Sequence, residues 1–262
     1  MIPYFQFVTI FIGPVPIHVW GLMVALGIIA AVLLMTRLAR KQLLSEAIIL
    51  DMAIWVLIGA FIFARVFDVV FYNWAYYLAH PVEVFQVWQG GMSSFGGFFG
   101  AALALWLFAK RRHLTLKDLW PYFDISALGL WLAWGIGRIG CFLIHDHPGI
   151  HTSFFLAVQY PDGTRFDLGL YESILGFLLF IIFGLLFKRL TKIRSGFVMI
   201  WSALSYAVAR FFLDFLRATD LPGSDARYFH LTPAQWGMLF LIVVLTSVLI
   251  FGRMKRRKSS QN

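Results

Sequence analysis

The chain has 262 residues, of which 60% are hydrophobic and only 13% are charged. Soluble domains are about 45–50% apolar and about 25% charged, so this composition excludes an ordinary cytosolic enzyme and a disordered chain. The net charge of +9 does not indicate a nucleic-acid binder, because lysine and arginine stand in short runs between apolar stretches. The single cysteine, Cys141, excludes a disulfide framework and a cluster of metal-binding thiolates.

Seven apolar stretches, taken in chain order, predict membrane-spanning helices, since a bilayer core about 30 Å thick needs roughly 20 apolar residues per helix. No internal repeat or low-complexity tract divides the chain. The sequence therefore predicts an all-α integral membrane protein, with a single polytopic domain over residues 1–262 and a basic cytoplasmic tail over 253–262. The predicted spans are His18–Met35, Ile48–Phe71, Phe95–Ala109, Leu119–Phe142, Leu168–Phe187, Ser195–Leu216 and Pro233–Phe251.

The distribution of lysine and arginine predicts the orientation of these helices. The segments after the first, third and fifth spans carry 3, 4 and 4 basic residues, and the C-terminus carries 5. On the opposite side stand only Arg165, Arg217 and Arg227. Basic residues accumulate on the cytoplasmic side of a membrane, so we expect the N-terminus outside and the C-terminus in the cytoplasm.

Ionisable residues inside the predicted spans are candidates for function, because they are costly to bury in a bilayer. Three of them are arginines that fall in the outer part of alternate spans, at similar depth. A guanidinium binds two phosphate oxygens at once, so these arginines predict a site for an anionic lipid headgroup. The full set is Arg65, Asp68, Asp124, Arg138, Glu172, Arg210 and Asp214.

Structural explanations stand beside this interpretation. Arg65 precedes Asp68 by three residues and Arg210 precedes Asp214 by four, so each pair can neutralise itself on one helix face. Arginine side chains can also extend toward the membrane surface. Arg138 has no acidic residue at helical spacing within its span, and it is therefore the strongest functional candidate of the three.

Two motifs carry further information. The stretch Gly90–Gly100 has five glycines, which permit close approach of another helix or of a ligand. Gly137-Arg138-Ile139-Gly140-Cys141-Phe142 then leads into Asp146 and Gly149. With this second motif the chain resembles the prolipoprotein diacylglyceryl transferases. Matching residues follow in order along the chain: Ile12–Pro14, Trp20–Met23, Tyr72, His80-Pro81, Gly90–Ser93, Leu170–Glu172, Tyr206–Arg210, Phe215–Arg217 and Gln235-Trp236.

The resemblance implies an activity in lipoprotein biogenesis at the bacterial cytoplasmic membrane. The family transfers a diacylglyceryl group from phosphatidylglycerol to the lipobox cysteine thiol of a prolipoprotein signal peptide, and glycerol phosphate leaves. The implied partners are these two substrates and membrane lipids, with no nucleic acid, and the scheme requires no metal or organic cofactor. The resemblance implies Arg138, Arg210 and Tyr206 as catalytic residues, and His145 and His147 of the external segment are further catalytic candidates, because an imidazole there could act as the base. The implied substrate-binding residues are Arg138, Arg65, Gly96, Gly97, Gly137, Gly140, Asp146, Gly149 and Glu172.

Three signature positions depart from the family. Phe95 replaces a histidine, Cys141 replaces an asparagine and Trp20 replaces a tyrosine. A phenylalanine cannot accept the thiol proton, so either the arginines stabilise a thiolate directly or His145 or His147 acts as the base. A metal site at His145-Asp146-His147 is a weaker interpretation, since the sequence indicates no further ligand. Cys141 itself is expected to be a small buried residue rather than a covalent nucleophile.

Two other function classes remain open at this point. A lipid-binding relative could keep the phosphate site, have an altered substrate or lack catalysis. A transporter could use a charged central path, although the paired halves and broken helices typical of transporters are not evident. A histidine of residues 145–151 that lies near Arg138 and the start of the third span would favour the enzyme, whereas loop side chains that all point to bulk water would favour the lipid-binding relative.

Overall fold

The computed structural model describes residues 1–87, 90–222 and 224–259, and over 251–259 it describes the backbone alone. The last three residues of the predicted basic tail lie outside the described residues. The chain is mostly helical and divides into two compact units. The first unit contains Met1–Met35 and the residues from Phe123 onward, and the second contains Thr36–Tyr122.

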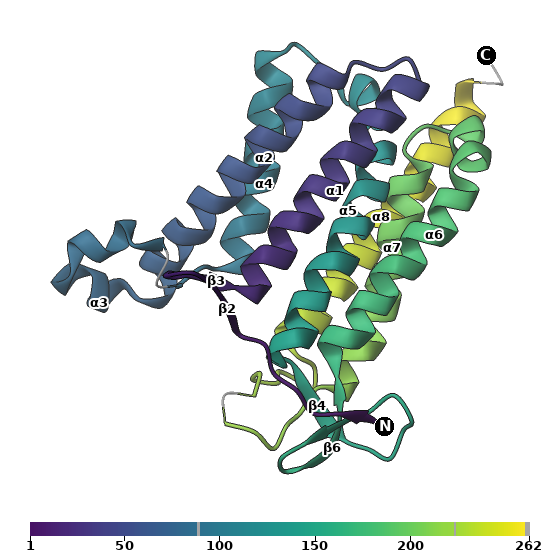
Figure 1. Cartoon of the computed structure of the whole chain (residues 1–262). Coiled ribbons are helices and arrows are strands. Elements are labelled where there is room, and N and C mark those ends of the chain that lie inside the picture. Colours follow the sequence, from purple (N-terminus) through teal and green to yellow (C-terminus); the bar gives the residue numbers. More distant parts are fainter. Residues whose placement is uncertain (88–89, 223, 260–262) are drawn as a thin grey trace. The chain divides into compact units, whose positions relative to one another are not determined.

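The first unit is built from long apolar helices. Neighbouring helices α6, α7 and α8 pack in sequence order, α7 against each of the other two (Figure 1). Helix α7 begins where the backbone N–H groups of Gly196 and Met199 donate to the carboxylate of Asp124, at 2.6 and 3.0 Å. A carboxylate at a helix N-terminus satisfies otherwise unpaired N–H groups, which accounts for the burial of Asp124. The helices are α1 (Val19–Lys41), α5 (Leu116–Ile144), α6 (Leu168–Ile193), α7 (Phe197–Leu213) and α8 (Pro233–Ser259); the end of α1 and the start of α5 belong to the second unit.

The second unit is a pair of helices joined by a shorter helical arm. Glycines bring the two helices together, since a Cβ atom at Gly59 would lie 2.7 Å from the Gly100 carbonyl oxygen and one at Gly100 would collide with Gly59. Small residues of this kind let membrane helices approach closely. The elements are α2 (Glu46–Phe67), a π-helix (Asp68–Tyr72), α3 (Trp74–Ala79), a 3-10 helix (Pro81–Phe85) and α4 (Ser94–Arg111).

Short strands show that the all-α prediction was incomplete. A four-stranded sheet with the order β1-β5-β6-β4 lies in the first unit, and β2 pairs with β3 in an antiparallel hairpin. These strands are two to five residues long, too short for an alternating pattern to reveal them in sequence. They are β1 (Ile2–Pro3), β2 (Thr9–Ile12), β3 (Val15–His18), β4 (Pro148–His151), β5 (Val158–Tyr160) and β6 (Gly163–Asp167).

Six helices within the described residues are long and apolar enough to cross a membrane. The third predicted span, Phe95–Ala109, is helix α4, and it is not among the six. Its 18 residues reach about 27 Å, and Lys110 and Arg111 in its last turn lower its average hydropathy. The six are Val19–Lys41, Glu46–Tyr72, Leu116–Ile144, Leu168–Ile193, Phe197–Leu216 and Pro233–Ile250.

Candidate functional site

Three helices of the first unit bring two arginines to one carboxylate. Arg138 on α5 places Nη2 3.0 Å from Oε2 of Glu172 on α6, and Arg210 on α7 places Nε 3.2 Å from Oε1 of the same residue. Neither contact has hydrogen-bond geometry, although both are ion-pair distances. The Glu172 side chain is fully buried, while the side chains of Arg138 and Arg210 are 17% and 7% exposed. Arg138 is therefore the more accessible of the two cations.

Arg210 continues this network toward the end of α7. Its Nη1 donates to Oδ1 of Asp214 at 2.6 Å, which confirms the pairing predicted from their four-residue spacing. Asp214 also accepts from Nε of Arg217 at 3.2 Å and from the Thr232 hydroxyl. Arg217 in turn lies 2.8 Å from Asp225. Positive and negative groups thus alternate from Arg138 to Asp225, so the buried charges are largely compensated.

Aromatic rings enclose the network. The Arg138 guanidinium lies 4.7 Å from the centre of the Trp134 ring. The Tyr206 ring lies between Trp131 and Trp134, with centroid distances of 5.0 and 5.5 Å. Apolar rings of this kind lower the local dielectric constant, and electrostatic interactions are stronger in such a medium. A phosphate that reached Arg138 would therefore be bound more tightly than at an exposed surface.

An apolar hollow of about 370 Å³ lies beside the network, between α6 and α7. Its lining includes Tyr171, Leu175, Ala209 and Leu213. Tyr171 precedes Glu172 and Ala209 precedes Arg210, so the hollow and the ion pairs share the same turns of the two helices.

Arg65 lies in the second unit and has a different environment. Its guanidinium donates to the carbonyl oxygens of Glu83, Val84, Gly90 and Gly91 at 2.5, 2.8, 2.6 and 3.0 Å. Asp68, the partner predicted from spacing, lies 4.0 Å away. The donors of Arg65 are thus occupied in holding the arm that precedes α4, and its predicted contact with a headgroup stays a prediction.

Three of the five predicted glycines occupy positions of close packing. A Cβ atom at Gly96 would lie 2.5 Å from Cβ of Phe67, and one at Gly97 would lie 3.8 Å from Ala64. At Gly140 a Cβ atom would come within 3.0 Å of Met23, and at Gly149 within 2.5 Å of the Leu216 carbonyl oxygen. Gly137 has more room, with Val24 at 3.8 Å. Gly96, Gly140 and Gly149 therefore have a sufficient structural reason to be glycine.

His145 is held rigidly just after α5. Its Nδ1 lies 2.5 Å from Oδ2 of Asp167, and Tyr160 donates to the same oxygen at 2.8 Å. Burial and the charge of Asp167 raise the pKa of Tyr160, so this hydroxyl stays protonated and serves as the donor. The Tyr4 ring stacks on His145 at 4.9 Å. Nε2 of His145 is enclosed and has no hydrogen-bond partner in the described part of the chain.

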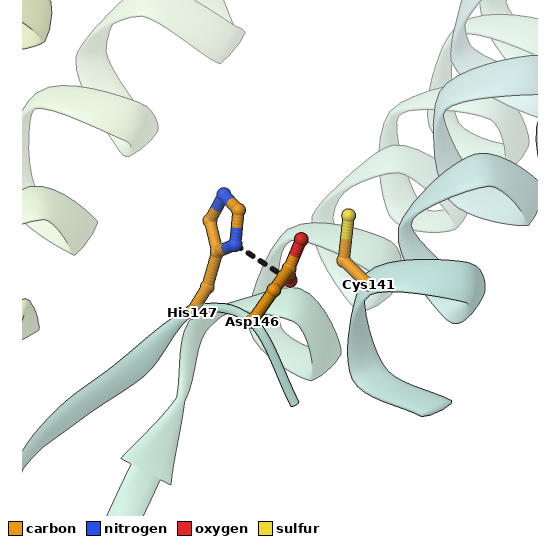
Figure 2. Close-up of side chains that lie close together, drawn as sticks. All are labelled: Cys141, Asp146 and His147. Carbon is orange, nitrogen blue, oxygen red and sulfur yellow. Dashed lines mark ion pairs between the residues drawn. The ribbon is translucent and has the colours of Figure 1, made fainter. Parts of the chain in front are cut away.

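Cys141, Asp146 and His147 form a cluster at the end of α5 that the sequence analysis did not assemble. The thiol sulfur, a carboxylate oxygen and a ring nitrogen all lie within 4.8 Å of one another, and Figure 2 shows the three side chains converging. The thiol of Cys141 is also 3.7 Å from Nη1 of Arg138. No sequence pattern predicts this cluster, because it depends on a sharp reversal of the backbone after α5, where His145 has a φ of 53°.

The chain is similar to a known family of membrane enzymes over nearly its whole length. The prolipoprotein diacylglyceryl transferase family matches residues 7–251. A phosphatidylglycerol–prolipoprotein diacylglyceryl transferase of Ligilactobacillus salivarius is 30% identical, over 94% of this chain and 93% of its own length. The enzymes of the same name from Listeria monocytogenes serotype 4b and Limosilactobacillus reuteri are 31% and 32% identical, over 95% and 94% of this chain and 90% of their own lengths.

These matches extend over nearly the whole chain, so they cover α5, α6 and α7 together with the arginines and Glu172 that those helices carry. The six long apolar helices agree with a multi-pass protein of the cytoplasmic membrane. The chain is a membrane transferase, and it belongs to the prolipoprotein diacylglyceryl transferase family.

Proposed function

We propose that this chain transfers the diacylglyceryl group of phosphatidylglycerol to the lipobox cysteine thiol of a prolipoprotein and releases glycerol phosphate. The observation that carries the proposal is the buried Arg138–Glu172–Arg210 arrangement. In this reaction a carbon–oxygen bond breaks, and the leaving phosphate gains negative charge. Cations fixed in a water-poor site stabilise such charge without reorganising.

The two arginines have different tasks in this proposal. Arg138 is the more exposed, so it meets the phosphate first and binds two of its oxygens. Arg210 is held from two sides by Glu172 and Asp214, and it supplies a fixed second cation as the phosphate becomes a dianion. Glu172 balances the two cations before substrate enters. Tyr206 keeps the surroundings dry and lies one helical turn before Arg210.

Other residues shape the binding site. An acyl chain of the lipid substrate lies in the apolar hollow between α6 and α7, next to Arg210. Gly140 and Gly149 bring backbones close enough to form the wall, Gly137 leaves room for substrate beside Val24, and Asp146 orients the glycerol hydroxyls of the headgroup. Arg65, Gly96 and Gly97 lie in the second unit, and their role in binding the substrate stays a prediction from the sequence.

The thiol must lose its proton, since the thiolate is the nucleophile. Two routes remain in this proposal. The field of Arg138 and Arg210 can stabilise the thiolate, or His145 or His147 can accept the proton. His145 has an enclosed Nε2 and a carboxylate on its other nitrogen, an arrangement that orients an imidazole for proton transfer.

The topology is part of the proposal. We place α4 as a seventh membrane-spanning helix of one polytopic domain, with the N-terminus outside and the tail over 253–262 in the cytoplasm. The asymmetry of lysine and arginine supports this orientation. A reporter fused after the last residue should be cytoplasmic, and a tag between β5 and β6 should be accessible from outside.

The direct test uses the purified full chain in vesicles of phosphatidylglycerol labelled in its acyl chains, with a lipobox peptide as acceptor. We expect label to move to the peptide in a thioether-linked diacylglyceryl group. A lipid-binding relative without catalysis would bind the same vesicles and leave the peptide unmodified, which would contradict the proposal.

A further inference from the structure

We propose that the outer edge of strand β2 binds the lipobox segment of the prolipoprotein, which pairs with it as an added antiparallel strand. The inference rests on the proposed function and deepens it, because it names the surface that receives the peptide substrate. Strand β2 (Thr9–Ile12) forms a hairpin with β3 (Val15–His18) directly before helix α1. Neither strand of this hairpin belongs to the four-stranded sheet, so the outer edge of each is free of that sheet.

The register of the hairpin decides which backbone groups point outward. Gly13, with a φ of 59°, and the residue after it form a two-residue turn, and a turn of this length fixes how the strands pair. In this register Phe11 lies opposite Pro16, which has no N–H to donate. Antiparallel strands alternate between hydrogen-bonded pairs and pairs whose backbone groups face away from each other. Phe11 and Pro16 must therefore be a pair of the second kind.

The two edges of the hairpin differ as a result. The N–H and C=O groups of Phe11, and those of Thr9 two residues earlier, point to the outer edge of β2. Within the described residues these backbone groups have no hydrogen-bond partner. On the outer edge of β3 the corresponding position is Pro16, which offers no donor. The edge of β2 can therefore accept a further strand, whereas the edge of β3 is blocked at its middle.

The outer edge of β2 leads to the arginine site. Phe7 precedes β2 on the same edge, and its N–H donates to the carbonyl oxygen of Leu143 at 2.9 Å. Leu143 lies near the end of α5, five residues after Arg138. Five helical residues span about 7.5 Å. A strand added along β2 therefore ends beside the last turns of the helix that carries Arg138.

The direction of β2 then fixes the direction of the peptide. Strand β2 runs from the α5 end toward the turn at Gly13. We orient the peptide with its cysteine at the α5 end, where the thiol is nearest to Arg138, and with the preceding signal-peptide residues along β2. Such a peptide runs opposite to β2, so the added strand is antiparallel.

The side chains of the hairpin also favour an apolar peptide. Four are 46–71% exposed, namely Ile10, Phe11, Ile12 and Val15. Residues 1–36 contain no Asp, Glu, Lys or Arg. Lipid covers such side chains, yet unpaired N–H and C=O groups are costly in hydrocarbon, where open sheet edges do not occur. An extended apolar peptide satisfies both needs, because it bonds to the backbone groups and covers the side chains.

The first experiment uses the two-residue repeat of strand pairing. The full chain in phosphatidylglycerol vesicles is assayed with a series of lipobox peptides, each carrying one N-methylated amide. Methylation at alternate residues should raise the KM for the peptide about 2- to 12-fold, because each loses one hydrogen bond to β2. Methylation at the intervening residues should leave the KM within about twofold. Equal sensitivity at all positions, or at none, would overturn the pairing.

The second experiment removes the matching donor from the protein. Phe11→Pro deletes an N–H that the hairpin does not use, and Phe11→Ala is the matched control that loses the ring and keeps the N–H. We expect the KM for the peptide to be about 2- to 12-fold higher in Phe11→Pro than in Phe11→Ala, at the same kcat. Pro16→Ala, on the blocked edge, should leave the KM unchanged. Equal KM values in folded Phe11→Pro and Phe11→Ala proteins would overturn the proposal.

The third experiment separates this inference from the proposed function. A chain with Phe11→p-benzoylphenylalanine is irradiated in the same vesicles with a lipobox peptide whose cysteine is replaced by serine. We expect cross-links to the peptide, and none from the same substitution at Leu43, which is 95% exposed beyond the other end of α1. Cross-links from position 11 to lipid alone would overturn peptide docking and leave the proposed function intact. Cross-links to the peptide in a chain that transfers no lipid to the cysteine peptide would support docking and contradict the proposed function.

Discussion

Arg65 and Arg138 are the same residue type at the same predicted depth, yet their surroundings differ. Arg65 donates to four backbone carbonyl oxygens of the arm before α4. Arg138 has Glu172, the Cys141 thiol and the Trp134 ring as its partners within the described chain. The donors of Arg65 are committed to the fold, whereas the guanidinium of Arg138 retains capacity for a further anion.

The difference shows that burial of a charge does not by itself identify a binding site. Both arginines are costly in a bilayer, and each has a compensating set of partners. Backbone carbonyls are fixed dipoles that a substrate cannot displace without unfolding the arm. Arg138 instead pairs with Glu172, a carboxylate that also pairs with Arg210. Its guanidinium can therefore also contact an incoming phosphate. The predictions below test this distinction.

The largest effect is expected from removal of either arginine that pairs with Glu172. Arg138→Ala and Arg210→Ala should each lower lipidation of a test precursor by about 10- to 150-fold, the equivalent of a charge-assisted contact of about 1.5–3 kcal/mol. The measurement is lipidation in cells that lack their own transferase, normalised to folded protein. Arg138→Lys is the matched control and should rescue poorly, because an ammonium cannot bind two phosphate oxygens in a plane. Unchanged lipidation by Arg138→Ala would contradict the proposed difference in role between Arg138 and Arg65.

Substitution of Arg65 should act on stability instead. A lysine cannot reach four carbonyl oxygens at once, so Arg65→Lys should lower the free energy of unfolding by about 1–3 kcal/mol. Thermal unfolding in detergent measures this change, and the rate of transfer per folded molecule should remain close to that of the unsubstituted chain. A stable Arg65→Lys protein that has lost transfer would show that Arg65 binds the headgroup, as the sequence predicts.

A smaller effect is expected at Phe95, in the same unit as Arg65. Its side chain is 69% exposed and touches the Phe67 ring at a centroid distance of 5.8 Å. A histidine fits this space, so Phe95→His should retain transfer within about threefold of the unsubstituted rate. Complete loss of lipidation in a folded Phe95→His protein would mean that the phenylalanine shapes a different substrate pocket.

The smallest effect concerns the ion pairs of Arg165, which serve the fold of the segment between α5 and α6. Hydrogen bonds from Arg165 lower the pKa of Asp220 from 3.8 to about 2. A carboxylate whose pKa is depressed in the folded state stabilises the fold above its unfolded pKa, and this contribution is lost as the pH falls from about 4 to 2. Unfolding temperatures measured over this range should decline less steeply for Asp220→Asn. Parallel curves for the two proteins would exclude the contribution.

Local patterns predicted much of the helical framework. The apolar runs correctly predicted the seven long helices, six of which have the length and hydropathy expected of a membrane span. The four-residue spacing predicted the Arg210–Asp214 pair. The bridge from Glu172 to two other helices depends on tertiary packing, and no spacing within one helix reveals it. The Cys141 cluster depends on the backbone reversal at His145, an unusual conformation for a non-glycine residue.

The central claim is that Arg138 and Arg210 bind the phosphate that leaves. The most direct measurement follows both products in one reaction, with phosphatidylglycerol labelled in its headgroup glycerol and in its acyl chains. The account predicts one glycerol phosphate released per thioether formed, with both products reduced together in Arg138→Ala and Arg210→Ala. Formation of the thioether at the unsubstituted rate by either variant would contradict the account.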